Sequence, residues 1–435
     1  MPKPLHVMRA LLVCTLALLY GMAFHNAYAS YINPVYEYGH YYYFPASFPQ
    51  TAATYALLVL PCLFFRWTQA PSACGIALFY ALCYVPTELI MLFNWNRSAE
   101  ELLLVQACLA ASMSVIMAFS ASGWRPAAQP IPPARIKPVM AVLMVISLSL
   151  LVWTYRDHMR FVGFDDVYDL RFETNELDTG PLVDYFVSWL SYCFLPYYLA
   201  RGIIDKRMRD VLLAITAALL IYMSTGAKAM ILMPPIMLIM HGLLKARERL
   251  LPMLLAVLTA ALFFVTEFLP DDGIGFWVKF VFLLRTMCAG GWANFVYYDY
   301  FTQNGLTYYS HIGVVNNLTG AYPYGKYSLG QTIGIEYSGS ELANYNANFW
   351  ASDGFAALGL VGIPVVTVAV IAMFYIINRI SSRYSAHFVA LWLSGFWLGL
   401  LNLPLTTALV SAGGALTLML LWFTAQRARR PRPAT

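Results

Sequence analysis

Long apolar stretches recur along the whole chain, separated by short connectors that hold most of the Lys and Arg residues. A transmembrane helix needs about 20 apolar residues to cross the hydrocarbon core of a bilayer. By that measure the pattern predicts about twelve transmembrane helices, at approximately 8–28, 51–65, 73–93, 101–121, 139–156, 182–200, 211–225, 229–244, 251–269, 355–377, 387–402 and 405–425. We therefore expect an all-α polytopic membrane protein that forms a single membrane domain over residues 1–435.

Two neighbouring stretches, 211–225 and 229–244, are short for independent transmembrane helices. The sequence Ser224-Thr225-Gly226-Ala227-Lys228 lies between them. The pair is therefore also compatible with one interrupted hairpin.

The composition supports this prediction. Hydrophobic residues make up 60% of the chain and charged residues only 11%, whereas a soluble domain carries roughly 25% charged residues. The net charge of +5 does not indicate nucleic-acid binding, because the basic residues lie in connectors and form no patch interleaved with aromatic residues. The seven cysteines include no CxxC pair, so neither a zinc site nor a disulfide framework is expected.

The distribution of basic residues predicts the orientation in the membrane. With the N-terminus inside, nineteen of the 27 Lys and Arg residues fall in inner connectors and eight in outer ones. Cytoplasmic loops are enriched in Lys and Arg. We therefore expect both termini in the cytoplasm. The eight outer basic residues are Arg97, Arg156, Arg160, Arg171, Lys228, Lys279, Arg285 and Lys326.

Three outer segments are long enough to carry function. The first, 29–50, is rich in tyrosine and is typical either of an aromatic belt at the membrane surface or of a platform for sugar rings. The second, 157–181, is a charged loop. The largest, 270–354, begins with an interrupted apolar stretch at 274–298, which we expect to be an interfacial helix within a large outer loop. We expect the chemistry of the protein on this outer face, because the inner connectors are short and basic or Pro-rich.

Charges inside the predicted helices lie near their outer ends, as for Glu88, Glu267 and Lys228. A charge at the centre of a bilayer costs at least about 2.5 kcal/mol on insertion scales. The pattern therefore indicates a hydrated cavity in the outer leaflet. A transporter would place polar groups at mid-membrane, which this chain mostly does not.

The outer loops combine arginines, tyrosines, a histidine and carboxylates, and the sequence contains no GxSxG, HExxH, Walker or GxGxxG motif. The guanidinium group suits phosphate because it donates paired hydrogen bonds and stays charged. A hydroxyl nucleophile would also need a base within hydrogen-bond reach. We expect Arg285, Arg171 and His311 to be catalytic, and Lys228, Tyr309, Tyr324 and Asn348 to contact the substrate.

Each candidate also has a purely structural interpretation. Arg285 could anchor an interfacial helix, and Arg171 could pair with Asp169 or Glu173 at the surface. Lys228 could cap a helix break, and a lone loop histidine such as His311 is more often structural. The adjacent carboxylates Asp165 and Asp166 could hold a metal ion, but such pairs are usually only solvated. We expect no metal and no soluble cofactor.

Five short segments resemble positions of a known family: Leu284-Arg285-Thr286, Asn346-Ala347-Asn348-Phe349 followed by Gly359-Leu360-Val361-Gly362, Thr225-Gly226-Ala227-Lys228, and Asp169-Leu170-Arg171. With twelve predicted helices and two large outer loops, the chain resembles the Wzy-type O-antigen polymerases of Gram-negative inner membranes. As an architecture, the resemblance to that family extends over most of the chain.

The resemblance implies a GT-C-like membrane fold with two large periplasmic loops, whose functional arginines correspond here to Arg171 and Arg285. Family loops often place a glycine at a set gap after the arginine, whereas eight residues separate Arg171 from Gly180. The related O-antigen ligases use a periplasmic histidine, for which His311 is the candidate.

The implied function is the polymerisation of undecaprenyl diphosphate-linked oligosaccharide repeat units on the periplasmic face of the bacterial inner membrane. The expected reaction is inverting and independent of metal. The implied partners are the lipid-linked oligosaccharide, membrane lipid and a protein that regulates chain length, and none is a nucleic acid. The alternatives are an O-antigen ligase that transfers glycan to lipid A-core, and a flippase for lipid-linked oligosaccharides.

Overall fold

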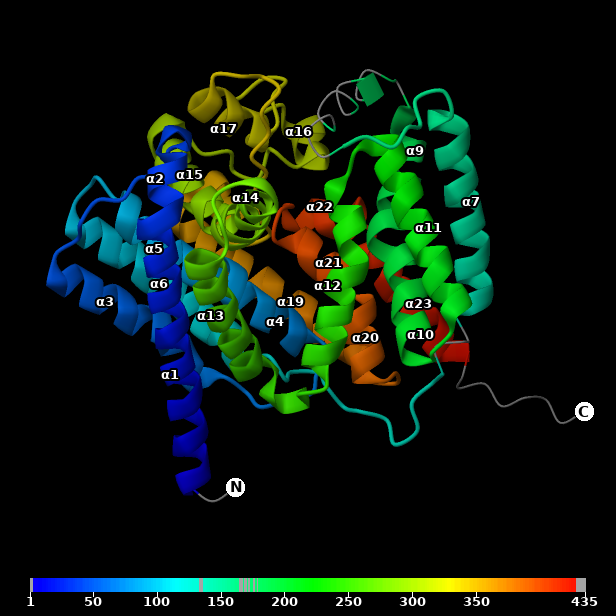
Figure 1. Ribbon diagram of the computed structural model, residues 1–435, viewed down its shortest axis with the longest axis horizontal. Coiled ribbons are helices and arrows are strands. Elements are labelled where there is room, and N and C mark those ends of the chain that lie inside the picture. Colours follow the sequence, from blue (N-terminus) through cyan, green and yellow to red (C-terminus); the bar gives the residue numbers. More distant parts are fainter. Residues whose placement is uncertain are drawn as a thin grey trace, which may run out of the picture.

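The computed structural model describes residues 3–132, 136–163 and 179–427, together with Val167, Leu170, Glu173, Thr174 and Leu177. All regular elements within these residues are helical (Figure 1). The elements of the first half are α1 (Lys3–Ala27), η1 (Tyr28–Ile32), α2 (Asn33–Tyr36), η2 (Glu37–Gly39), α3 (Phe48–Val59), η3 (Leu60–Phe64), α4 (Ser72–Phe79), η4 (Tyr80–Tyr84), α5 (Val85–Asn94), α6 (Ala99–Ala118), α7 (Lys137–Tyr155), α9 (Gly180–Trp189), η6 (Leu190–Phe194), α10 (Leu195–Ile204) and α11 (Met208–Thr225).

The second half begins with the long helices of the bundle and then crosses the large loop between α15 and α18. Its elements are α12 (Lys228–Leu244), η7 (Arg247–Arg249), α13 (Leu250–Phe268), α14 (Gly273–Lys279), η8 (Phe280–Cys288), α15 (Ala289–Asn304), α16 (Gly313–Thr319), α17 (Leu329–Ser338), α18 (Ala351–Leu358), η9 (Gly359–Val361), α19 (Gly362–Ser381), α20 (Ala386–Trp392), α21 (Ser394–Leu400), α22 (Leu405–Val410) and α23 (Gly414–Arg427).

Eight helical runs in the described residues are long and apolar enough to cross a membrane: Val7–Gly39, Ser72–Asn94, Ala99–Ala118, Lys137–Tyr155, Met208–Thr225, Arg247–Phe268, Gly273–Asn304 and Ala351–Ser381. Three shorter apolar helices accompany them: Phe48–Phe64, Lys228–Leu244 and Gly414–Ala425. The prediction of an all-helical polytopic membrane protein is confirmed at this level. The number of twelve transmembrane helices and the GT-C-like fold stay predictions.

The interrupted apolar stretch at 274–298 lies within one helical run of 32 residues, Gly273–Asn304. Its central part, η8, is π-helical, with nine residues between α14 and α15. We expected an interfacial helix here, and the run is also long enough to cross a membrane. The shorter pair of stretches, by contrast, forms two separate helices, α11 and α12, on either side of Gly226 (φ 62°).

Connectors that the sequence places on one side of the membrane meet at one end of the bundle. The guanidinium of Arg9 lies 4.8 Å from the ring centroid of Trp67. The amide of Ala127 donates to the carbonyl of Ser382 (2.9 Å), and Arg383 donates to the carbonyl of Ala425 (3.1 Å). We call this the terminal end, because α1 begins and α23 ends there (Figure 1), and we call the opposite end the loop end.

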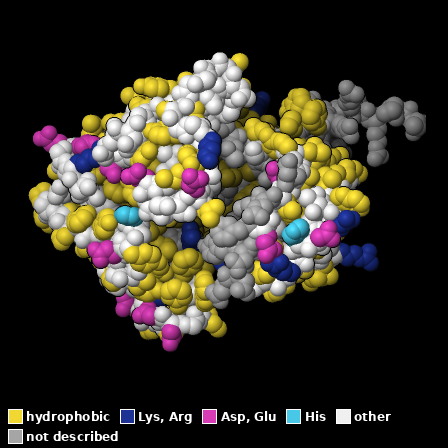
Figure 2. All heavy atoms as spheres, turned by 90° about the horizontal axis from the view of Figure 1, so that it is seen from above, with side chains coloured by type: hydrophobic (Ala, Val, Ile, Leu, Met, Phe, Trp, Pro, Cys, Tyr) yellow, Lys and Arg dark blue, Asp and Glu magenta, His cyan; other side chains and the backbone are white. Residues whose placement is uncertain are grey.

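The loop end is covered by α16 and α17 (Figure 1), and acidic and basic side chains are both scattered over its surface (Figure 2). The tyrosine-rich segment after α2 packs onto this end. Tyr41 stacks on Trp292 with ring centroids 5.4 Å apart, and a ring nitrogen of His40 lies 3.0 Å from the carbonyl oxygen of Tyr337. The segment therefore packs against α15 and α17, and part of its aromatic surface is used for this packing.

A chain of buried polar side chains connects α5, α15 and the start of α18. The amide of Asn348 donates to the side-chain oxygen of Asn294 (2.7 Å), and Asn294 donates to the hydroxyl of Thr87 (2.8 Å). All three residues are fully buried. The helices can approach this closely because Gly290 faces η4 and Gly291 faces α5. Small residues at helix interfaces and interhelical hydrogen bonds are the usual means of association in a membrane.

We expect Gly291→Ala to destabilise the protein by roughly 1–3 kcal/mol, the usual cost of overpacking. An added Cβ at Gly291 would lie 2.6 Å from the carbonyl carbon of Pro86, which is backbone and cannot move aside. Gly242→Ala is the matched control, because nothing lies within 4 Å of a Cβ at that helical position. Thermal unfolding in detergent should separate the two variants. Equal melting temperatures would contradict the close approach of α15 to α5.

Candidate active site at the loop end

His311 forms a hydrogen-bonded pair with Asp353, an acid 42 residues away in the chain. The Nε2 atom of His311 lies 2.9 Å from Oδ1 of Asp353, and Nδ1 lies 2.8 Å from the hydroxyl of Thr307. The side chains of His311 and Asp353 are only 6% and 5% exposed. A carboxylate that receives one ring N–H orients the imidazole and stabilises its protonated form, as general-base catalysis requires.

The loop before His311 is held across the end of α18. The amides of Thr307 and Tyr308 donate to the carbonyls of Ala356 (2.8 Å) and Ala357 (2.9 Å). Tyr308 and Tyr309 have φ angles of 50° and 61°, which side-chain-bearing residues seldom adopt. Such strained residues persist where surrounding contacts fix them, and they are frequent at active sites. Here they turn the chain so that His311 faces Asp353.

Asp353 is held from two further directions. It lies in the first turn of α18, where the helix dipole favours a negative charge. Its second oxygen, Oδ2, accepts a hydrogen bond from the backbone amide of Leu405 (3.3 Å), the first residue of α22. The carboxylate therefore joins the loop of His311, α18 and α22 at one point.

Both ring nitrogens of His311 are engaged, which constrains how it could act. In the neutral imidazole one nitrogen donates and the other accepts. Donation from Nε2 to Asp353 leaves Nδ1 as the acceptor, facing the hydroxyl of Thr307. That hydroxyl also lies 3.1 Å from the carbonyl oxygen of Ala356. The oxygen of Thr307 stays in front of Nδ1 whichever way its proton turns, so Nδ1 can receive a proton through the hydroxyl of Thr307.

His311 lines a cleft of about 630 Å³ at the loop end. The other walls come from α9, α16, α17, the loop before α18, and α22. Polar and aromatic side chains among the lining residues are suited to sugar hydroxyls and ring faces: Tyr185, Asn316, Tyr322, Lys326, Gln331, Asn346 and Thr407. A volume of this size falls within the usual range of ligand pockets, about 300–1,000 Å³.

Arg285 and Lys228 belong to a second cluster, which is built on aromatic rings. The guanidinium of Arg285 lies 5.4 Å from the ring centroid of Phe280, and Nζ of Lys228 lies 5.8 Å from that of Trp277. The rings of Trp277 and Phe280 are 5.9 Å apart. These contacts bring together two candidates that are 57 positions apart in the sequence. The negative face of an aromatic ring attracts a cation placed over it.

Arg285 differs from the other described arginines of the loop end in its pairing. Arg156 and Arg160 form ion pairs with Asp157 (3.3 Å) and Glu173 (2.7 Å). The side chain of Arg285 is exposed, and within the described part of the chain it forms no ion pair. It also lies in the π-helical segment η8, a geometry that is frequent at functional sites.

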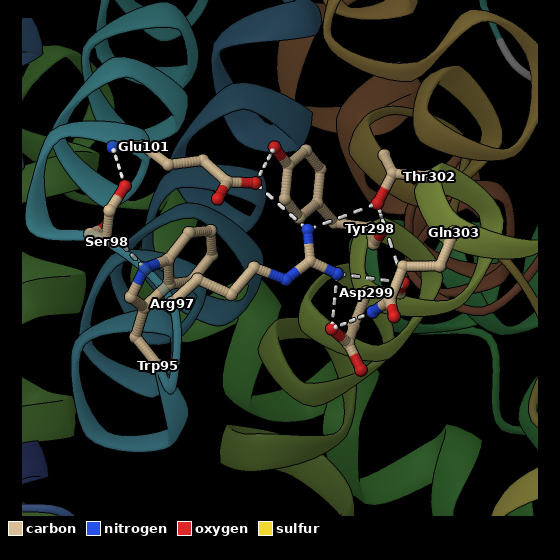
Figure 3. A network of polar contacts seen from close by, with 8 residues as sticks. All are labelled: Trp95, Arg97, Ser98, Glu101, Tyr298, Asp299, Thr302 and Gln303. Carbon is tan, nitrogen blue, oxygen red and sulfur yellow. Dashed lines mark hydrogen bonds and ion pairs between the residues drawn. The ribbon is translucent and has the colours of Figure 1, made fainter.

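Arg97 shows the contrasting case of a neutralised arginine (Figure 3). It lies between Asp299 (2.6 Å) and Glu101 (2.9 Å), and it lies over the ring of Tyr298. Tyr337 donates to the other oxygen of Asp299 (3.1 Å). This network fixes the α5–α6 connector to α15 and to α17. Because its charge is compensated, Arg97 is a poor candidate for binding phosphate.

The remaining candidates have structural partners. Tyr309 is half-buried, and burial together with the charge of Asp353 raises its pKa to about 12. The hydroxyl of Tyr324 donates to the carbonyl of Gly305 (2.6 Å) and so holds the start of the His311 loop. Asn348 is fully buried, and its amide is used between α15 and α18. Arg171 lies outside the described residues, as do Asp165, Asp166 and Asp169.

The sequence alone did not single out Asp353. The only local signal is an acid close to the start of a helix, directly after the aromatic pair Phe349-Trp350. Among the described residues, no group of three or more His, Cys, Asp or Glu side chains could hold a metal ion.

We expect the mutants His311→Ala and Asp353→Ala to be energetically coupled in a double-mutant cycle of unfolding. A buried hydrogen bond to a charged group contributes about 1.5–3 kcal/mol, so the double mutant should be less unstable than the sum of the single mutants by about that amount. Thermal unfolding in detergent measures this coupling. His25→Ala is the control partner for Asp353→Ala, because His25 binds Tyr43 and Tyr55 instead. Effects of His311 and Asp353 that simply add would contradict the pair.

Comparison with protein-family models, with curated proteins and with solved structures gives no match to this chain. No residue role can therefore be transferred from a matched relative.

Proposed function

We propose that this protein is a membrane glycosyltransferase that polymerises undecaprenyl diphosphate-linked oligosaccharide repeat units, as its resemblance to the Wzy-type O-antigen polymerases implies. The observation that carries the proposal is the buried His311–Asp353 pair at the wall of a polar and aromatic cleft. A base next to a sugar-sized cleft is what the transfer of a glycan to a hydroxyl group requires.

In the proposed reaction a hydroxyl group of the acceptor sugar attacks the anomeric carbon of the donor glycan. A bond forms between the hydroxyl oxygen and the anomeric carbon, and the bond from that carbon to the diphosphate breaks. The electron pair leaves with undecaprenyl diphosphate, and the hydroxyl proton passes to the oxygen of Thr307 while Thr307 passes its own proton to Nδ1 of His311. A single displacement of this kind inverts the anomeric configuration.

The proposed role of Arg285 is to stabilise the charge that develops on the departing diphosphate. An uncompensated guanidinium can donate paired hydrogen bonds to phosphate oxygens, and Arg285 is exposed without an ion pair among the described residues. Lys228 adds a second positive charge over the neighbouring ring of Trp277. The polyisoprenyl chain of the carrier would lie along the apolar helix surface next to these cations.

The positions of the basic connectors also support a proposal for the membrane and the orientation of the protein. The termini and the basic connectors share the terminal end of the bundle, and Lys and Arg are enriched in cytoplasmic loops. We infer an inner-membrane protein with cytoplasmic termini, twelve transmembrane helices of GT-C type and an active face at the loop end, in the periplasm.

We expect Arg285→Ala to lower the rate of polymerisation at least about 100-fold, the usual effect of losing one group that stabilises transition-state charge. His311→Ala should lower it by a similar factor or more, since general-base catalysis contributes about 10²–10⁴. The measurement uses purified protein with undecaprenyl diphosphate-linked repeat units in detergent, with chelator present, and a ladder of products on a gel.

Arg156→Ala is the matched control, because this loop-end arginine is exposed but already pairs with Asp157. It should leave the ladder unchanged. A ladder that Arg285→Ala also leaves unchanged would discard Arg285 as a catalytic residue. Transfer to added lipid A-core without a ladder would contradict a polymerase and indicate an O-antigen ligase. Absence of both products with active control enzymes present would contradict glycosyl transfer.

A further inference from the structure

The connector between α12 and α13 concentrates positive charge at the terminal end. Its five residues, 245–249, contain Lys245, Arg247 and Arg249 and one acid, Glu248. The three basic side chains are exposed. Throughout the described chain, none of the three forms an ion pair. The proposed reaction at the loop end makes no use of these charges.

The backbone of the connector divides the three cations between two hollows. Arg247 has a φ angle of 53°, in the left-handed region that side-chain-bearing residues seldom adopt. Arg247 lines a hollow together with Ser385 and His387. Lys245 and Arg249, on either side of it in sequence, line another hollow. The strained turn therefore keeps Lys245 and Arg249 on a common side.

The hollow of Lys245 and Arg249 has a volume of about 550 Å³ and lies between α1 and the start of α13. Its other lining residues are Leu12, Ala246, Pro252 and Met253. Leu12 and Met253 are 50% and 43% exposed, on helices that are apolar enough to cross a membrane. One side of the hollow therefore presents two uncompensated cations, and the other side presents apolar side chains to the bilayer.

We propose that this hollow binds an anionic phospholipid of the leaflet at the terminal end. Lys245 and Arg249 receive the phosphodiester group, and the acyl chains extend along Leu12 of α1 and Met253 of α13. The match is one of charge and of polarity: the lipid carries one negative charge next to its apolar chains, and the hollow places its cations next to apolar surface. Basic pockets between transmembrane helices are known to bind lipid headgroups in this manner.

The apolar rim favours a membrane lipid over a soluble phosphate, which would leave Leu12 and Met253 without a partner. The lipid-linked glycan is also anionic, but its proposed site is the Arg285 cluster at α14 and η8. In Figure 1 that cluster lies in the upper half of the bundle, whereas the start of α13 lies at the lower end. The proposal is therefore independent of the proposed glycosyltransferase activity.

Native mass spectrometry of the full-length protein tests the proposal. The purified protein is mixed with phosphatidylglycerol and, separately, with phosphatidylcholine of the same acyl chains. We expect phosphatidylglycerol to bind preferentially. In the double variant Lys245→Gln and Arg249→Gln its affinity should fall roughly 30-fold, because each basic residue near an anionic lipid contributes a factor of roughly five.

The matched control is the double variant Lys206→Gln and Arg209→Gln, which removes two exposed cations, one from the α10–α11 connector and one from the first turn of α11, without touching the hollow. It should keep the affinity for phosphatidylglycerol. Equal losses in the two double variants would overturn the proposal, because the effect would then come from net charge alone. Equal binding of phosphatidylcholine and phosphatidylglycerol would overturn it too, as would displacement of phosphatidylglycerol from the wild-type protein by undecaprenyl diphosphate at equal concentration.

Discussion

The close contact of α15 with α5 and α18 is the feature on which the loop end depends. Backbone polar groups in lipid must be satisfied within the helices, and side-chain amides can then form cross-links between them. Asn294 uses its amide in this way, toward Thr87 on one side and Asn348 on the other. Asn348 leads directly into α18, whose first turn carries Asp353. The segment that leads to the partner of the candidate base is thus anchored deep in the bundle.

The helices could be predicted from the sequence, and so could the grouping of their connectors at the two ends of the bundle. Hydropathy and the distribution of Lys and Arg, on which both predictions depend, are local properties of the chain. His311 could be proposed by residue type, but its partner could not, since 42 residues of loop and helix separate it from Asp353. The sequence also suggested Asn348 as a substrate contact. The sequence around an asparagine looks the same whether its amide is buried between helices or exposed in a cleft. Only the packing of α15 shows that Asn348 is buried.

The arginines of the loop end show why residue type alone predicts a phosphate site poorly. Arg97 and Arg285 are both basic residues on the side that the sequence assigns to the periplasm. Two carboxylates neutralise Arg97, so a bound diphosphate would have to compete with fixed anions 2.6 and 2.9 Å away. Arg285 contacts an aromatic face instead. An aromatic ring attracts a cation without consuming its hydrogen-bond donors, so the donors of Arg285 remain available to a ligand.

Backbone strain occurs in this chain outside the α-helices, at residues with several different roles. Among the described residues, five other than glycine have positive φ angles: His40, Lys206, Arg247, Tyr308 and Tyr309. Each such residue costs about 1–3 kcal/mol, so surrounding contacts must hold it in place. At Tyr308 the holding contact is the hydrogen bond from its amide to the carbonyl of Ala357, and the result is an imidazole directed at a carboxylate. At Tyr308 and Tyr309 the strain therefore serves to position a titratable group, whereas the α-helices that form the hydrophobic core contain no such strained residue other than glycine among the described residues.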